Sequence, residues 1–207
     1  MDQAPGPPPS SLPTGDGHAL ALQHARVIVG FYEYHALDSL ASCGHAERRL
    51  AENTLWWHDH TGDKVVYWGG MAHTANGNPR AISSPPSPPA TDRSAGSYLR
   101  DHFGPGYVSV ALAFHHGSAP YPVPTPSPEF ADAVLGGVGL DAYVLDLHAQ
   151  QPQAVRAWLN APAKTRLIGP HYDPEDDPAY HMSGGSLADW FDLIIHSQEA
   201  TPIRLLA

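Results

Sequence analysis

The sequence has a single cysteine, Cys43, among 207 residues. One thiol cannot form an internal disulfide, so nothing in the sequence indicates an oxidising compartment. Long apolar runs are also absent, and the N-terminus lacks the basic and then apolar pattern of a signal peptide. We therefore expect a cytoplasmic protein that makes no membrane contact.

Basic residues are scarce. The chain carries 11 Lys and Arg against 21 Asp and Glu, which gives a formal net charge of −10. Nucleic-acid grooves and anionic membrane surfaces are bound by clustered positive charge, which this chain does not have. We therefore expect no nucleic-acid partner, and a small-molecule substrate becomes the simplest ligand class.

Proline and histidine are both abundant. The 22 prolines concentrate in residues 5–13, 79–89 and 120–128, where they exclude helix and remove backbone donors. The sequence therefore predicts a disordered tail over residues 1–17, one domain over residues 18–207, and two proline-rich loops. One of these loops is expected to run from Thr74 to Ala95 without regular structure.

Helical and strand-like patterns alternate along the domain, which is typical of an α/β fold. Helices are predicted over residues 18–40, 45–60, 97–103, 129–135, 153–160 and 186–191, and a polar loop over residues 171–183. Short strands are predicted over residues 64–68, 107–114, 142–147, 165–168 and 193–196. We expect a mostly parallel, short-stranded sheet flanked by helices.

The first predicted helix has an apolar stripe. Leu22, Ala25, Ile28 or Val29, and Tyr32 recur at helical spacing. Such a stripe is expected to pack against another part of the structure.

Histidine follows each predicted strand, at His73, His115 and His116, His148, His171 and His196. In a parallel sheet these rings would gather along one edge, where they could hold a metal or act as a base near neutral pH. The alternative is that a histidine-rich chain simply places some histidines at polar strand ends. Because no metal-binding motif is present, we predict neither a metal site nor a cofactor.

Several motifs, in order along the chain, resemble those of the erythromycin esterase family. They are Arg48-Arg-Leu-Ala-Glu-Asn53 with Trp56, Lys64-Val-Val-Tyr-Trp-Gly-Gly-Met-Ala-His73, Gly96-Ser-Tyr-Leu-Arg100 with Tyr107-Val-Ser-Val110, and Tyr180-His-Met-Ser-Gly-Gly-Ser-Leu-Ala-Asp-Trp-Phe-Asp192 with Thr201-Pro202. The resemblance implies a hydrolase that opens a macrolide lactone or another carboxylic ester with water activated by a histidine.

The resemblance also implies site residues. His73 matches the second histidine of the family's Trp-Ala-His-Asn-x-His segment and is the expected catalytic residue, while Gly70 and Met71 replace the first histidine and the asparagine. The substrate-binding candidates are Arg48, Trp68, Tyr180 and His181.

The resemblance is to the C-terminal half of the family's domain. It therefore implies an incomplete sheet with exposed apolar surface, and either a missing N-terminal half or a partner chain. Two hypotheses remain open: an ester hydrolase, which is inactive alone if truncated, and a noncatalytic binding remnant of the same fold.

Overall fold

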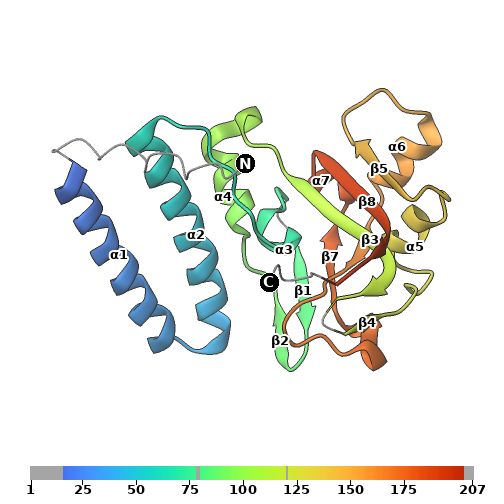
Figure 1. Ribbon diagram of the computed structural model, residues 1–207, viewed down its shortest axis with the longest axis horizontal. Coiled ribbons are helices and arrows are strands. Elements are labelled where there is room, and N and C mark those ends of the chain that lie inside the picture. The colour runs from blue at the N-terminus through green and yellow to red at the C-terminus, as the bar shows by residue number, and fades with distance from the viewer. Residues whose placement is uncertain (1–15, 78–79, 120, 203–207) are drawn as a thin grey trace, which may run out of the picture.

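The computed structural model describes residues 16–77, 80–119 and 121–202, and only the backbone of residues 39 and 40. Helices α1 (Asp16–Ala36) and α2 (Ser39–Thr61) form an antiparallel hairpin on one side of the molecule (Figure 1). Both predicted helices are present, but the break between them lies at residues 37 and 38 and not at residues 41–44, which belong to α2. Most of the predicted tail lies outside the described residues, but Asp16 and Gly17 belong to α1.

The remaining helices are short. They are α3 (Met71–Thr74), α4 (Ala95–Phe103), the 3-10 turn η1 (Gly104–Gly106), α5 (Ala131–Gly136), α6 (Gln153–Leu159), the 3-10 segment η2 (Pro174–Ala179) and α7 (Leu187–Trp190). Helices α4, α5, α6 and α7 confirm the helices predicted near those positions. In α7, the capping box of Ser186 and Asp189 satisfies the first free backbone donors.

Two four-stranded sheets lie beside the helical hairpin (Figure 1). The first has the order β2 (Ser87–Ala90), β1 (Ala81–Ser84), β7 (His181–Gly185), β6 (Ala163–Arg166). The second has the order β4 (Pro122–Val123), β3 (Val110–Ser118), β8 (Leu193–Ala200), β5 (Ala142–Asp146). The molecule therefore combines α and β structure, as predicted.

The expectation of a mostly parallel sheet is wrong. Among the strand pairs of the described residues, only β3 and β8 are parallel. Strands β1 and β2 are joined by a tight turn, and a tight turn forces antiparallel pairing. Strand patterns fix which residues alternate across a sheet, but they do not fix the direction of the neighbouring strand.

Three local predictions are corrected. Residues 64–68 form no strand, since no strand of the described residues pairs with them, and Val66 and Trp68 are 86% and 83% exposed. The expected loop over residues 74–95 contains α3 residue Thr74 and the β1–β2 hairpin, in which prolines are tolerated because β2 is an edge strand. The expected loop over residues 171–183 contains η2 and the start of β7.

The main core lies between the two sheets and the short helices. Its fully buried centre includes Met182 from β7, Trp190 and Phe191 from the α7 region, and Ile194 from β8. A smaller cluster of Ala51, Ala95 and Leu99 joins α2 to α4. No helix within the described ranges is long and apolar enough to cross a membrane.

Asp192 connects four segments next to this core. Its carboxylate accepts hydrogen bonds from the backbone of Ser109 (2.7 Å), from Asn76 (3.2 Å), from Arg100 (2.5 Å) and from His148 (2.8 Å). Burial raises the pKa of the Asp192 carboxyl, but these four hydrogen bonds outweigh burial and hold the pKa below its ordinary value.

Replacing Asp192 by Asn is expected to lower the free energy of unfolding by about 2 kcal/mol at neutral pH, since the ionised acceptor shared by four donors is lost. A lowered pKa stabilises the fold above the unfolded value near about 4 and loses this effect as pH falls through the folded value. Denaturant unfolding at several pH values should therefore show the two proteins converging in acid. The exposed pair of Arg93 and Asp101 gives the control, because Asp101→Asn should cost less than about 1 kcal/mol.

His196 is fully buried in β8 and stacks on Tyr143 with ring centroids 5.0 Å apart. Neither ring nitrogen has a hydrogen-bond partner among the residues that the structure describes. Burial, together with the nearby His115, lowers the pKa of His196. This histidine therefore belongs to the core and not to an exposed strand end.

Acid should destabilise the protein partly through His196. A lowered folded pKa means that the unfolded chain binds more protons, so stability is complete above about pH 6.5 and falls as pH drops through the folded value. His196→Phe, which keeps the stacking on Tyr143, should reduce the slope of stability against pH in this range. The control is the same substitution at the exposed His171, which should leave the slope unchanged. An unchanged slope in His196→Phe would contradict the assignment.

Candidate functional site

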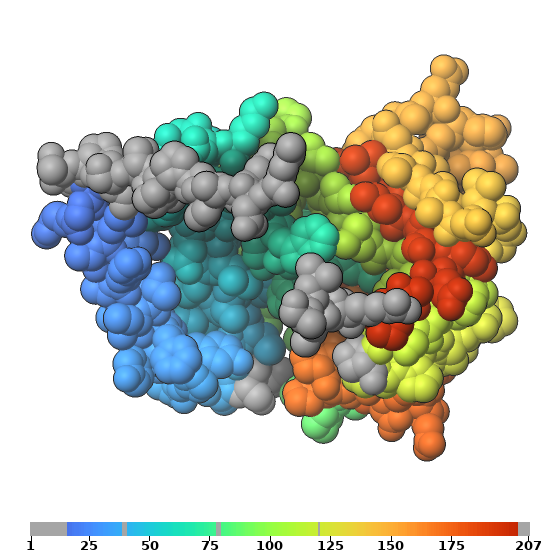
Figure 2. Space-filling view, viewed as in Figure 1, coloured from blue at the N-terminus to red at the C-terminus, as the bar shows by residue number. Residues whose placement is uncertain are grey.

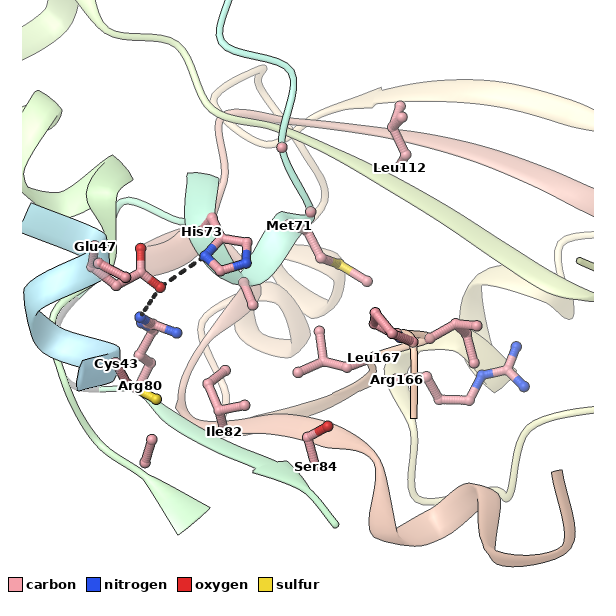
Figure 3. Close-up of a pocket in the computed structure, with 18 of the residues that line it drawn as sticks. Cys43, Glu47, Met71, His73, Arg80, Ile82, Ser84, Leu112, Arg166 and Leu167 are labelled. Carbon is pink, nitrogen blue, oxygen red and sulfur yellow. Dashed lines mark hydrogen bonds and ion pairs between the residues drawn. The ribbon is translucent and has the colours of Figure 1, made fainter. Parts of the chain in front are cut away.

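A pocket of about 780 Å³ opens between α2, α3, the β1–β2 hairpin and β3 (Figure 3). One end is polar and contains Glu47, His73 and Arg80. The remaining wall is largely apolar, with Met71, Ile82, Leu112 and Leu167 among its residues. A cavity of this size with a few converging polar groups is typical of a small-molecule site.

Glu47 is the buried anchor of the polar end. Its side chain projects from α2 and is 7% exposed. One carboxylate oxygen, Oε1, accepts from Nδ1 of His73 at 2.9 Å and from Nη2 of Arg80 at 3.0 Å, and Oε2 accepts from the backbone N–H of Ala95 at 2.7 Å. Three donors therefore compensate the desolvation of this carboxylate.

His73 faces the pocket from the short helix α3 (Figure 3). Its side chain is 49% exposed. Because a carboxylate only accepts, the ring nitrogen that faces Glu47 carries the proton, and the neutral ring keeps its free lone pair on Nε2. No described residue forms a hydrogen bond with Nε2. This nitrogen can therefore accept a proton from a molecule in the pocket.

The position of His73 is fixed by contacts to the next residue, Thr74. The Thr74 carbonyl oxygen accepts from Oγ of Ser109 at 2.6 Å and from the hydroxyl of Tyr107 at 2.8 Å. Burial, with a smaller contribution from Tyr67, raises the pKa of Tyr107 to about 12, so its hydroxyl remains a donor at neutral pH. The end of α3 is thus held against the segment between η1 and β3.

Gly96 permits the close approach of α4 to α3. A Cβ atom at residue 96 would lie 2.3 Å from the carbonyl oxygen of Thr74. The preceding residue, Ala95, supplies the N–H that binds Glu47. A glycine in the first turn of α4 therefore brings together the two segments that hold His73 and Glu47.

Arg80 completes the polar end. It is 4% exposed, and its guanidinium donates to Glu47. Its Nε is buried without a partner in the described part of the chain. A positive charge buried beside Glu47 balances the negative charge of the carboxylate.

The other predicted site residues lie in different parts of the structure. Trp68 lines the pocket together with His73. Arg48 lies instead in a separate polar hollow of about 510 Å³ with His45, Asp92 and Tyr98. Tyr180 is buried against Tyr172, and His181 lies beside the ring of Phe130; neither residue lines the pocket.

The predicted gathering of histidines occurs only in part, because His115 and His196 lie near each other on the parallel strands β3 and β8. His148 follows β5, which runs antiparallel to β8, so it lies beside the start of β8, whereas His196 lies in the middle of that strand. Its ring binds Asp192. Within the described ranges, no group of three or more His, Cys, Asp or Glu side chains is arranged to hold a metal ion.

Glu47 and Arg80 were not identified from the sequence. A weak signal existed for Glu47, because it lies one turn before Leu50 and Ala51 on the inner face of α2 and is therefore an acidic residue at a core position. Arg80 gave no signal, because it lies in a proline-rich segment, 33 residues after its partner.

Gly96→Ala is expected to lower the free energy of unfolding by about 1–3 kcal/mol, because the added methyl group forces α4 away from Thr74. The same displacement should weaken binding of any ligand that contacts His73. Thermal unfolding checks the first effect. The matched control is Gly17→Ala in α1, where a Cβ meets no atom within 4 Å and stability should not fall.

The chain was compared with known proteins. A family model described as erythromycin esterase matches residues 8–200. No curated protein matches the sequence. The crystal structure of a protein from Bacillus cereus is similar, with 23% sequence identity and a TM-score of 0.70 over 89% of this chain.

A second crystal structure, of a succinoglycan biosynthesis protein, has 20% identity and a TM-score of 0.69 over 91% of this chain. This chain covers 46% of each of the two longer chains. At these identities the likeness shows a shared fold. Because the family model matches most of the sequence, this chain belongs to the erythromycin esterase family.

Proposed function

We propose that this chain is a carboxylic ester hydrolase in which His73 is the general base. The observation that supports the proposal is the pairing of His73 with buried Glu47, which leaves Nε2 as a proton acceptor at an open pocket. An imidazole oriented by a carboxylate is a general solution for activating water near neutral pH. Membership of a hydrolase family supports the same reaction class.

Nε2 of His73 takes a proton from a water molecule, and the oxygen of that water attacks the ester carbonyl carbon and forms a tetrahedral intermediate. The intermediate collapses, the carbon–oxygen bond of the ester breaks, and the imidazolium returns the proton to the leaving alkoxide. Glu47 stabilises the imidazolium between these two steps because its carboxylate is 2.9 Å from Nδ1. The products are a carboxylic acid and an alcohol.

The shape of the pocket supports a large, mostly apolar ester. The volume of about 780 Å³ is within the range of about 300–1,000 Å³ for small-molecule sites. Met71, Ile82, Leu112 and Leu167 offer apolar surface next to His73, and Trp68 borders the same opening. We propose a macrolide lactone as the most specific substrate class that agrees with this lining and with the family.

A second candidate is a noncatalytic binding domain with the same pocket. It is favoured by the exposure of His73 at 49%, because a base that is open to bulk water is not enclosed with its substrate. Trp68, which lines the pocket, is also exposed. We propose that, in this case, a further polypeptide covers this side of the pocket.

His73→Ala should reduce ester hydrolysis by at least about 100-fold, because the proton acceptor is removed. The measurement is the rate of hydrolysis of an activated aryl ester, together with mass spectrometry of a macrolide to detect the gain of one water. His181→Ala, which changes a histidine outside the pocket, should retain full activity. An equal loss in both variants would refute the role of His73, and an inactive but folded wild type would favour the binding domain.

Glu47→Gln should lower kcat by about 10- to 100-fold with little change in KM, since glutamine fills the same volume but stabilises the imidazolium poorly. Steady-state kinetics of the folded variant check this outcome. A variant that loses affinity but keeps kcat would contradict the proposed role.

A further inference from the structure

The apolar stripe of α1 points away from the rest of the protein. The residues that the sequence predicts to pack inward are exposed: Leu22 is 45%, Ile28 57%, Val29 52% and Tyr32 69% exposed. Ala21 and Ala25, which lie on the same face of the helix, are also exposed. Helix α1 forms the outer edge of the molecule in both views (Figures 1 and 2).

The opposite face of α1 contacts α2 mainly through polar groups. Gln23 donates to Asn53 at 2.9 Å, and Glu33 pairs with Arg49. Gly30 is buried and leaves room for the side chain of Arg49, because a Cβ atom at residue 30 would lie 3.1 Å from that side chain. The hairpin therefore holds α1 in place without using its outer apolar residues.

The outer face of α1 has a heptad-like spacing, with Ala21, Ala25, Ile28 and Tyr32 in the middle and His18 and His35 at its two ends. Positions 18, 21, 25, 28, 32 and 35 are separated alternately by three and four residues, which is the pattern of a helix that packs along a second helix. A specific interface buries at least about 600 Å² on each partner, so the dimer must bury this face along most of its length. Such a face is expected to be covered by a partner.

We propose that the stripe on α1 is the contact between two copies of this chain, paired antiparallel about a two-fold axis. The stripe is self-complementary in size: its N-terminal half presents Ala21 and Ala25, and its C-terminal half presents Ile28 and Tyr32. In an antiparallel pair, Ala21 faces Tyr32 and Ala25 faces Ile28 of the second copy. Small residues therefore receive large ones, and the opposed helix dipoles attract.

A membrane surface fits this stripe less well. Helices that lie on membranes carry several Lys or Arg residues on the polar face, whereas α1 has one, Arg26. The chain also has a net charge of −10, which disfavours anionic lipids. The proposed contact is separate from the pocket, because none of the stripe residues lines it.

Sedimentation velocity of the full chain, from low to high micromolar concentration, tests the dimer. The wild type should show a reversible monomer–dimer equilibrium, and Ile28→Glu should raise the dissociation constant at least about tenfold. The matched control is Val138→Glu, at a valine that is 55% exposed far from α1 along the chain, and it should dimerise like the wild type. A wild type that stays monomeric, or equal weakening by both variants, overturns the proposal.

Cross-linking tests the antiparallel arrangement. With Cys43→Ser as background, the thiols of His18→Cys in one copy and His35→Cys in the other should lie close together. A short bismaleimide should therefore link a mixture of the two variants, but neither variant alone, because like positions are separated by about 25 Å along the axis. Cross-linking of each variant with itself would show a parallel pair and overturn the arrangement.

Ile28→Glu and Val138→Glu change no residue that lines the pocket, so the test of the dimer does not depend on the proposed hydrolase activity. Ester hydrolysis by Ile28→Glu should equal that of the wild type if both proposals hold. An inactive wild type that still dimerises would separate the two conclusions.

Discussion

The buried carboxylate of Glu47 is the interaction on which the polar end of the pocket depends. It joins α2 to α3, to the segment before β1 and to the start of α4 through three hydrogen bonds of 2.7–3.0 Å. A buried charge without partners is strongly unfavourable, so the segments that carry the donors are stabilised in this one arrangement. The same contact that fixes the fold here also sets the tautomer of His73, which links stability directly to the proposed chemistry.

Two further anchors support this arrangement from the side of the sheets. Asp192 gathers Asn76, Arg100, Ser109 and His148, and the Thr74 carbonyl receives two hydroxyl donors next to Gly96. Both anchors hold the segment that carries His73 from outside the pocket. A base held in this way loses little conformational freedom when it takes a proton, which favours general base catalysis.

The helical hairpin serves two purposes with different faces. Helix α2 sends Glu47 inward to the pocket, whereas α1 is attached to α2 through polar contacts and presents its apolar stripe outward. The exposed row of Leu112, Val144 and Ile195 on the second sheet is another apolar surface of this kind. The described part of the chain thus exposes two apolar surfaces of the kind that interfaces bury.

The sequence by itself determined the approximate positions of the long helices and the family, because helical periodicity and the motifs are local properties. Only the tertiary structure decided strand direction, the exposure of residues 64–68 and of the α1 stripe, and the pairing of His73 with Glu47 and Arg80. The physical reason is distance along the chain. Glu47 lies 26 residues from His73 and 33 from Arg80, and partners that far apart are chosen by packing, which no local pattern encodes.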